Sequence, residues 1–301
     1  MFASRLPGTS LPGSPPARAA SAAFARRQRS GLRCCTVALM AVMAVAACQR
    51  ETPPATPAVA TGPASAATSP PPLQDVIERD PRYLIGISYP PVARDYPRLA
   101  AALQQYANAA RAELMQAVEG LGAQTPPAPY DLSLSFSQLA LTPQLIVVAA
   151  DGSSYTGGAH GNPLLARFVW LRQSDQPLTA TMLVPDPQAW RDISAYVREQ
   201  LYAALSQRID ADALPPAERA DLAKNAGRMI DDGTAPDPRN FAQFEPVFGD
   251  GGKIAALRFV FAPYQVGPYS DGVQTVDVPA DVLLPGIAPQ YRALFSGGQG
   301  R

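Results

Sequence analysis

Apolar and polar residues alternate over several short stretches, which predicts strands with one buried face. The pattern changes from about Val76. The first alternating stretch is Tyr83, Ile85, Ile87 and Tyr89, and Pro90-Pro91 ends it. The stretch at 250–252 (Asp-Gly-Gly) predicts a hairpin turn. The remaining predicted strands cover residues 130–136, 145–150, 164–171, 244–248, 254–261 and 273–278.

Longer stretches carry apolar residues at helical spacing. One stripe recurs every three or four positions from Leu99 to Leu121, and Gly122 with Pro126-Pro127 closes it. A second stripe joins Trp190 to Leu205. Three further predictions are a helix from Pro215-Pro216 to about Ile230, a polar loop at 231–240 in which Asp231 and Asp232 form a solvated turn, and a short helical stretch at 280–295.

Strands that cluster between helices and are joined by hairpin-type turns favour an α+β fold over a doubly wound parallel sheet. We expect antiparallel or mixed sheets with two long packing helices. The pattern predicts a single compact domain of two similar-sized halves, residues 76–160 and 161–298.

The N-terminal region has a different composition. Residues 1–33 are basic and contain no acid, and residues 34–47 form an apolar run of 14. A membrane span needs about 20 residues, so the run fits the apolar part of a signal peptide. Residues 45–48 (Val-Ala-Ala-Cys) resemble a bacterial lipoprotein signal. We therefore expect a signal peptide at 1–47 and a lipid on Cys48; the alternative is an ordinary signal peptide with an incidental cysteine.

A lipid at Cys48 would hold the chain stably on a membrane, facing the periplasm of the cell envelope. Gln49 favours the outer over the inner membrane. Residues 48–75 are rich in Pro, Ala and Thr and poor in large apolar side chains, which predicts a disordered linker after the lipidated cysteine.

Charge and cysteine content exclude several classes. Subtracting the six arginines of residues 1–47 from the 25 basic residues leaves 19 against 25 acidic ones. An acidic mature chain argues against a nucleic-acid partner and against adhesion to anionic lipid. The three cysteines are Cys34, Cys35 and Cys48, so the folded part has neither a disulfide nor a cysteine metal site. No phosphate-loop, dinucleotide or zinc-protease motif is present, and we expect no cofactor.

Two loops carry candidate chemistry. The first, 153–162, holds the single histidine, His160, among three glycines, with Tyr155 and Asn162 beside it. It predicts either a binding or catalytic loop or a tight structural connection. A metal site needs further ligands. A Ser154–His160 triad has no nucleophile-elbow motif to support it.

The second loop, 262–272, carries Tyr264, Tyr269 and Asp271 around a Gly-Pro turn. Exposed tyrosines bury large areas at a modest entropy cost, so they serve well in recognition. The alternative is a strand-to-strand crossover whose rings cap the core. The remaining carboxylates are dispersed along the sequence and predict no acid–base pair.

Three segments resemble a family of bacterial envelope domains of largely unknown function. They are ISYP at 87–90, SYTGGAHGNP at 154–163 and LRFVFAPYQVGPYSDGVQTVDVP at 257–279. The family includes the extracellular domain of the lysozyme-sensing anti-sigma factor RsiV and the non-catalytic N-terminal region of the peptidoglycan deacetylase PdaC. The resemblance implies an α+β domain facing the cell wall that binds lysozyme or a wall-derived ligand. The resemblance does not extend to the signalling segment of RsiV or to the deacetylase domain of PdaC.

We therefore expect a membrane-anchored envelope lipoprotein that binds a cell-wall fragment or a lysozyme-like protein. The alternatives are a structural or assembly lipoprotein without a small ligand and, ranked last, a hydrolase that uses His160. The expected binding residues are Tyr155, His160, Asn162, Tyr264, Tyr269 and Asp271.

Overall fold

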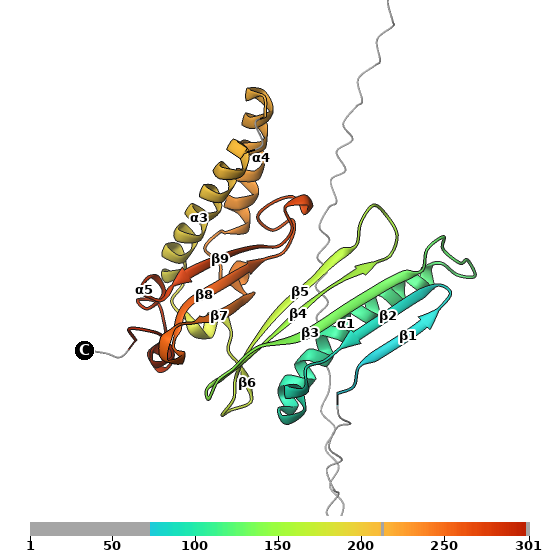
Figure 1. The fold of residues 1–301 in the computed structure, drawn as a ribbon, viewed down its shortest axis with the longest axis horizontal. Helices are drawn as coiled ribbons and strands as arrows, with labels where there is room; N and C mark the ends of the chain where they lie inside the picture. Colours follow the sequence, from blue (N-terminus) through green and yellow to red (C-terminus); the bar gives the residue numbers. More distant parts are fainter. Residues whose placement is uncertain (1–72, 212–213, 299–301) are drawn as a thin grey trace, which may run out of the picture. The chain divides into compact units, whose positions relative to one another are not determined.

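The computed structural model describes residues 73–211 and 214–298, which form an α+β fold with two sheets (Figure 1). This confirms the expected fold class. The predicted signal peptide (1–47), the lipidation site Cys48 and the linker as far as residue 72 lie outside the described residues. Within the described ranges, none of the helices combines the length and apolarity needed to cross a membrane.

The first sheet has six strands that stand in chain order. They are β1 (Val76–Asp80), β2 (Tyr83–Ser88), β3 (Tyr130–Leu141), β4 (Leu145–Tyr155), β5 (Asn162–Leu171) and β6 (Gln176–Pro177). The β2–β3 pair is parallel and the others are antiparallel, so the sheet is mixed. The pattern did not predict β1, in which three of five residues are charged, or β6, which has two residues.

A short 3-10 helix, η1 (Pro91–Asp95), and the long helix α1 (Pro97–Gly120) connect β2 to β3. The buried residues of α1 repeat every three or four positions, as predicted from the sequence: Leu99, Leu103, Ala107, Ala110, Leu114 and Val118. They pack on one face of the six-stranded sheet, against inward residues of β2, β3 and β4. We call this packing the first core.

The first part of strand β4 is buried on both faces. Its residues 145–150 (LIVVAA) form a continuous buried run, which is typical of a strand covered on two sides. Ile146 and Val148 belong to the first core, whereas Leu145 and Val147 belong to a second core built with the C-terminal elements. On β5, Trp170 belongs to the first core and Val169 to the second. The two cores therefore share β4 and β5.

The second sheet is antiparallel and has three strands, β7 (Phe244–Phe248), β8 (Ile254–Phe261) and β9 (Gln274–Pro279). The expected turn at 250–252 connects β7 and β8 as the 3-10 helix η3 (Asp250–Gly252). The other helical segments of the described C-terminal part are α2 (Ala180–Leu183), α3 (Ala189–Ala211), α4 (Pro216–Gly233), η2 (Pro238–Phe241), η4 (Tyr269–Asp271), α5 (Ala280–Leu283) and η5 (Pro289–Leu294).

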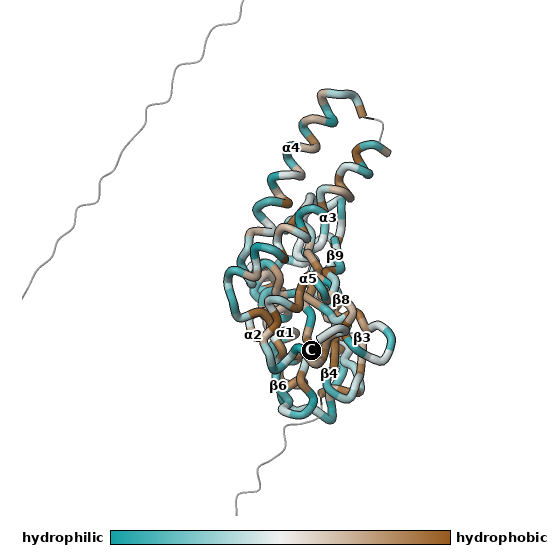
Figure 2. The backbone as a smooth tube through the Cα atoms, turned by 90° about the vertical axis from the view of Figure 1, so that its left-hand side faces the viewer, coloured by the Kyte–Doolittle hydropathy of each residue, from teal (hydrophilic) through white to brown (hydrophobic). Residues whose placement is uncertain are grey.

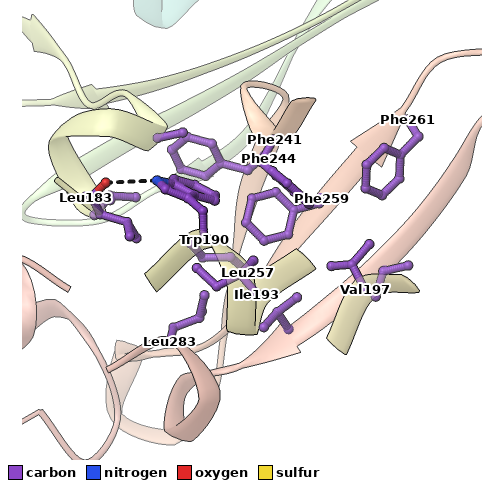
Figure 3. Packing of buried hydrophobic residues seen from close by; sticks show 14 of the residues in the cluster. Leu183, Trp190, Ile193, Val197, Phe241, Phe244, Leu257, Phe259, Phe261 and Leu283 are labelled. Carbon is purple, nitrogen blue, oxygen red and sulfur yellow. Dashed lines mark hydrogen bonds between the residues drawn. The ribbon is translucent and has the colours of Figure 1, made fainter. Parts of the chain in front are cut away.

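Aromatic side chains fill the centre of the second core (Figure 3). The Trp190 ring stacks on Phe241 with a centroid separation of 5.3 Å, and Phe241 meets the edge of Phe259 at 5.2 Å. The indole N–H of Trp190 donates to the carbonyl of Val184 over 3.1 Å. The buried donor is therefore satisfied, as a tryptophan in a core requires.

Hydrophilic residues predominate along α4, which buries only Ala226, Gly227 and Ile230 (Figure 2). The helix continues to Gly233, so the prediction that Asp231 and Asp232 form a loop is wrong. Contacts with α3 explain the extra turn. Asp231 pairs with Arg198 over 3.2 Å, and the Ser194 hydroxyl donates to the carbonyl of Thr234 just beyond the helix end.

The two sheets are joined by a buried ion pair. Arg167 on β5 donates through Nε to Glu245 on β7 over 2.9 Å, and through Nη1 to Asp151 on β4 over 2.9 Å. The Arg167 and Glu245 side chains are only 10% and 16% exposed. The Gln243 side chain also accepts the backbone N–H of Arg167 over 2.7 Å. Polar groups thus fix the edge of β5 against the second sheet.

The N-terminus of α1 is capped from outside the helix. Tyr96, at the N-cap position, makes no side-chain capping bond. Instead the Asp175 carboxylate, in the β5–β6 turn, accepts the backbone N–H of Arg98 over 3.0 Å and the indole N–H of Trp170 over 2.6 Å. A carboxylate here satisfies free helix N–H groups and complements the helix dipole. The β5–β6 turn is therefore tied to α1.

We predict that Asp175→Ala lowers the free energy of unfolding by about 2 to 3 kcal/mol. The change removes a cap worth about 1 kcal/mol and leaves a buried indole donor without its acceptor. Urea unfolding of the full chain measures the loss. Asp175→Asn keeps one acceptor oxygen and should lose less. Asp210→Ala removes only an exposed ion pair with Arg219 and should cost under about 0.5 kcal/mol; an equal loss for Asp175→Ala and Asp210→Ala would contradict the cap.

Candidate functional site

The two loops singled out in the sequence meet. The first connects β4 to β5 and the second connects β8 to β9. The His160 ring stacks on the Tyr269 ring at a centroid distance of 3.9 Å and an interplanar angle of 15°. The Tyr264 ring lies 6.2 Å from His160 and 5.8 Å from Tyr269. We call His160, Tyr264 and Tyr269 the aromatic cluster.

Hydrogen bonds fix the His160 ring within the aromatic cluster. Nδ1 lies 3.0 Å from the carbonyl oxygen of Gly161, and Nε2 lies 3.1 Å from the Tyr264 hydroxyl. A carbonyl can only accept, so Nδ1 donates to Gly161, and the tautomer protonated on Nδ1 leaves Nε2 to accept from the Tyr264 hydroxyl. Both ring nitrogens are thereby occupied. Within the described residues, neither is bonded to a serine, a cysteine or a carboxylate, so the arrangement is not a nucleophile–base pair.

Glycines shape the first loop. Gly157 and Gly158 have φ angles of 96° and 100°, which side chains rarely adopt. The Tyr155 hydroxyl donates to the carbonyl of Gly158 over 3.2 Å, so Tyr155 holds the loop instead of joining the aromatic cluster. Asn162 is exposed at the start of β5 and pairs in register with Ser154. Its side chain makes no hydrogen bond within the described ranges.

The second loop holds Tyr264 in a strained conformation. Its φ is +73°, in the left-handed region that a bulky residue seldom occupies. The surrounding loop fixes this conformation: the N–H of Tyr264 donates to Gly267 over 2.9 Å, and the Gln265 side chain donates to the carbonyls of Gly233 and Asn240. A Cβ on Gly233 would overlap the Gln265 carbonyl, so α4 packs closely against the loop. Such strain persists where the surroundings over-determine it, often at binding sites.

Asp271 anchors the second loop instead of contacting His160. Its carboxylate pairs with Arg208 on α3 over 2.7 Å and is 12% exposed. A Cβ on Gly267 would lie only 2.8 Å from that carboxylate, so the glycine permits the close approach. Asp271 thus positions the short 3-10 turn η4, which carries Tyr269.

The aromatic cluster is open to solvent, because His160 is exposed and Tyr264 is 55% exposed. A row of hydroxyls lies on the neighbouring β3 and β4. Ser133 and Ser135 on β3 are exposed and pair in register with Ser153 and Asp151 on β4. This face, which we call the serine face, is opposite α1, and Asp151 on it contacts Arg167.

One acid of the serine face stands in a less polar setting. Asp131 on β3 pairs in register with Tyr155, and burial raises the pKa of its carboxyl. No group of three or more His, Cys, Asp or Glu within the described ranges is placed to hold a metal ion. Exposed rings, hydroxyls and carboxylates together provide stacking surfaces and polar partners for a ligand.

The sequence pattern did not predict two groups of charged side chains that the fold assembles. Arg167 and Glu245, which join the sheets, belong to a network that includes Asp151, Arg258 and Asp277. Carboxylates that are dispersed in the sequence therefore gather in space. An arginine inside the apolar run LLARFVWL was the available signal. The second group surrounds Arg172, which follows β5 and donates to the Tyr96 hydroxyl over 2.8 Å. No sequence signal marked it.

Residues 181–281 match the model of a family described as "Protein of unknown function (DUF3298)". The matched segment runs from α2 into α5, so it includes Tyr264, Tyr269 and Asp271 but not His160. No curated protein matches the chain.

The solved structures that are similar to this chain include two proteins of the DUF3298 family. One is a DUF3298 family protein from Pseudomonas aeruginosa PAO1, with 17% identity, a TM-score of 0.47, and coverage of 75% of this chain and 96% of that one. The other is a member of the same family from Bacteroides fragilis NCTC 9343, with 15% identity, a TM-score of 0.39, and coverage of 66% and 70%.

We predict that Tyr264→Gly is more stable than Tyr264→Ala by about 1 kcal/mol. Both changes remove the ring, but only glycine adopts a φ of +73° without strain. Urea unfolding measures the difference. Tyr202, within helix α3, is the control, because there the glycine variant should be less stable than the alanine variant by about 1 kcal/mol. The same order of stability at both positions would show that Tyr264 is unstrained.

Proposed function

We propose that this chain is a lipid-anchored protein of the bacterial cell envelope that binds a cell-wall-derived glycan through the aromatic cluster and the adjoining serine face. The observation that carries the proposal is the convergence of His160, Tyr264 and Tyr269 from two loops 104 residues apart into an exposed group of rings.

The chemistry of this surface suits a sugar. A pyranose ring has an apolar face of C–H groups, which packs on an aromatic ring, and a rim of hydroxyls, which both donate and accept. The aromatic cluster offers the rings. Ser133, Ser135 and Ser153 offer exposed hydroxyls, and Asp151 offers a carboxylate. The strain held at Tyr264 supports a binding role, since packing alone does not require a left-handed tyrosine.

The sequence supplies the rest of the proposal. The segments at 154–163 and 257–279 resemble the envelope domains of RsiV and PdaC, which suggests a wall-derived ligand, with a lysozyme-like protein as the competing partner. The Cys48 signal would place the domain on a membrane facing the periplasm, at the end of the linker.

We predict that the purified full chain binds muropeptides, the disaccharide-peptides of peptidoglycan, and that Tyr264→Ala and Tyr269→Ala each weaken binding about tenfold. Loss of a stacking ring worth about 1.4 kcal/mol corresponds to that factor. Isothermal titration calorimetry measures the affinity. Tyr202→Ala removes a tyrosine of 38% exposure elsewhere on the surface and is the matched control.

Equal affinity of the Tyr264→Ala and Tyr202→Ala variants would remove the aromatic cluster from the binding site. Binding of lysozyme without binding of muropeptides would assign the surface to a protein partner. No binding of either probe at high micromolar concentration would overturn the proposal.

We predict that Cys48→Ala moves the protein from the membrane fraction to the soluble envelope fraction, because the thiol is the attachment point for the lipid. Cell fractionation and intact-mass measurement of the mature chain test this. An unmodified Cys48 thiol in the membrane-associated protein would contradict the anchor.

A further inference from the structure

A cavity of about 780 Å³ lies at the Leu145 end of β4, remote along that strand from the first loop. Ligand sites in proteins have volumes of about 300 to 1,000 Å³. Four segments meet around the cavity: the β3–β4 turn, the β5–β6 turn, the residue before α1 and the 3-10 helix η5. The lining residues that matter here are Tyr96, Gln144, Arg172, Gln173, Gln290 and Tyr291.

The Arg172 side chain is held in place before any ligand arrives. Nε donates to the Tyr96 hydroxyl over 2.8 Å, and Nη1 donates to the carbonyl of Thr142 over 2.7 Å. The backbone N–H of Arg172 also donates to Gln144 over 2.9 Å. The β3–β4 turn is itself braced, because the Thr142 hydroxyl accepts the N–H of Leu145. Asp175 fixes the β5–β6 turn on its other side.

Arg172 lacks the partner that other half-buried arginines have. Arg111, Arg167 and Arg208 each pair with a carboxylate within 3 Å. No carboxylate of the described residues lies within ion-pair distance of Arg172, and its two side-chain bonds use Nε and Nη1 only. Among the described residues that line the cavity, Arg172 is also the single charged one. A half-buried cation without a counter-charge favours an anionic group.

A second cavity, of about 300 Å³, adjoins the first and shares Pro143, Gln144 and Leu294 with it. Lys253 is its single charged lining residue within the described ranges, and the Lys253 ammonium is held by the carbonyl of Ala293 over 2.5 Å. The two cavities therefore carry positive charge and no lining acid. Their combined surface attracts an elongated ligand with a negative end.

We propose that the Arg172 cavity binds the C-terminal end of a short peptide. The planar guanidinium matches a carboxylate better than a simple point charge does. The amides of Gln144, Gln173 and Gln290 each donate and accept, as peptide groups require. Tyr96 and Tyr291 provide rings for the peptide side chains. None of these residues belongs to the aromatic cluster, so this site is separate from the proposed glycan surface.

The test uses the full chain and two pools of N-acetylated tripeptides with randomised side chains, one with free carboxylates and one amidated. Saturation-transfer NMR detects the bound peptides. We expect transfer to the free-acid pool, and transfer at least tenfold weaker to the amidated pool.

The matched variants change one charge each. Gln290→Glu places a negative charge in the cavity without removing any hydrogen bond that Arg172 makes, and it should reduce transfer at least tenfold. Gln116→Glu makes the same change on an exposed residue of α1, roughly 30 Å along the helix from Tyr96, and should leave transfer unchanged. These variants keep Arg172, so a loss of binding would not reflect failure of its turn to fold.

Three outcomes would overturn the proposal: no transfer to the free-acid pool, equal transfer to both pools, or equal transfer for Gln290→Glu and Gln116→Glu. The Tyr264→Ala variant should bind the free-acid pool as the unchanged chain does. This result distinguishes failure of the cavity from failure of the glycan surface.

Discussion

Burial on both faces, at residues 145–150 of β4 and at Val169 and Trp170 of β5, is the constraint on which the rest of the structure depends. Ile146 and Val148 pack under α1, while Leu145 and Val147 pack against the C-terminal elements. The two cores cannot shift relative to each other without exposing one side of these strands. The hairpin formed by β4 and β5 therefore has a fixed relation to the second sheet, and the tip of that hairpin carries His160 beside the β8–β9 loop.

Charges reinforce this arrangement near the middle of the hairpin. Arg167 and Glu245 are largely removed from water, and removing one partner of a buried pair costs about 3 to 5 kcal/mol because the other charge is left uncompensated. We expect the pair to favour the one alignment of the two sheets in which both charges are compensated. That alignment determines which loops meet. The predicted boundary at 160/161 falls in the β4–β5 connection, which contacts Tyr264 and Tyr269 of the β8–β9 loop.

Local patterns predicted the elements that bury a periodic face. The stripe from Leu99 to Leu121 became α1, and the alternation at Tyr83–Tyr89 became β2. Elements that depend on contacts with other elements, and not on a periodic pattern of their own, were not predictable. Strand β1 forms by pairing with β2, and the last turn of α4 forms because Ser194 and Arg198 of α3 contact it. Propensity alone favoured a loop at Asp231-Asp232.

The candidate sites were also predictable only in part from the sequence. Glycines and tyrosines marked both loops as unusual, but only the fold reveals that the His160 ring stacks on Tyr269. The roles of Tyr155 and Asp271, which hold the loops, depend on contacts with Gly158 and Arg208 that no spacing rule gives. Arg172 was not recognisable at all, because its lack of a carboxylate partner is a property of its surroundings.

The sequential strand order has a consequence for how the molecule reaches its native state. In each sheet every strand pairs with its immediate neighbours in the chain, from β1 to β6 and from β7 to β9. The antiparallel pairs of consecutive strands close small loops and lose little chain entropy, so they form quickly, whereas the parallel β2–β3 pair needs the crossover through α1. The strands of each sheet can therefore pair in the order in which they emerge, but Leu145, Val147 and Val169 are buried only when the C-terminal elements arrive.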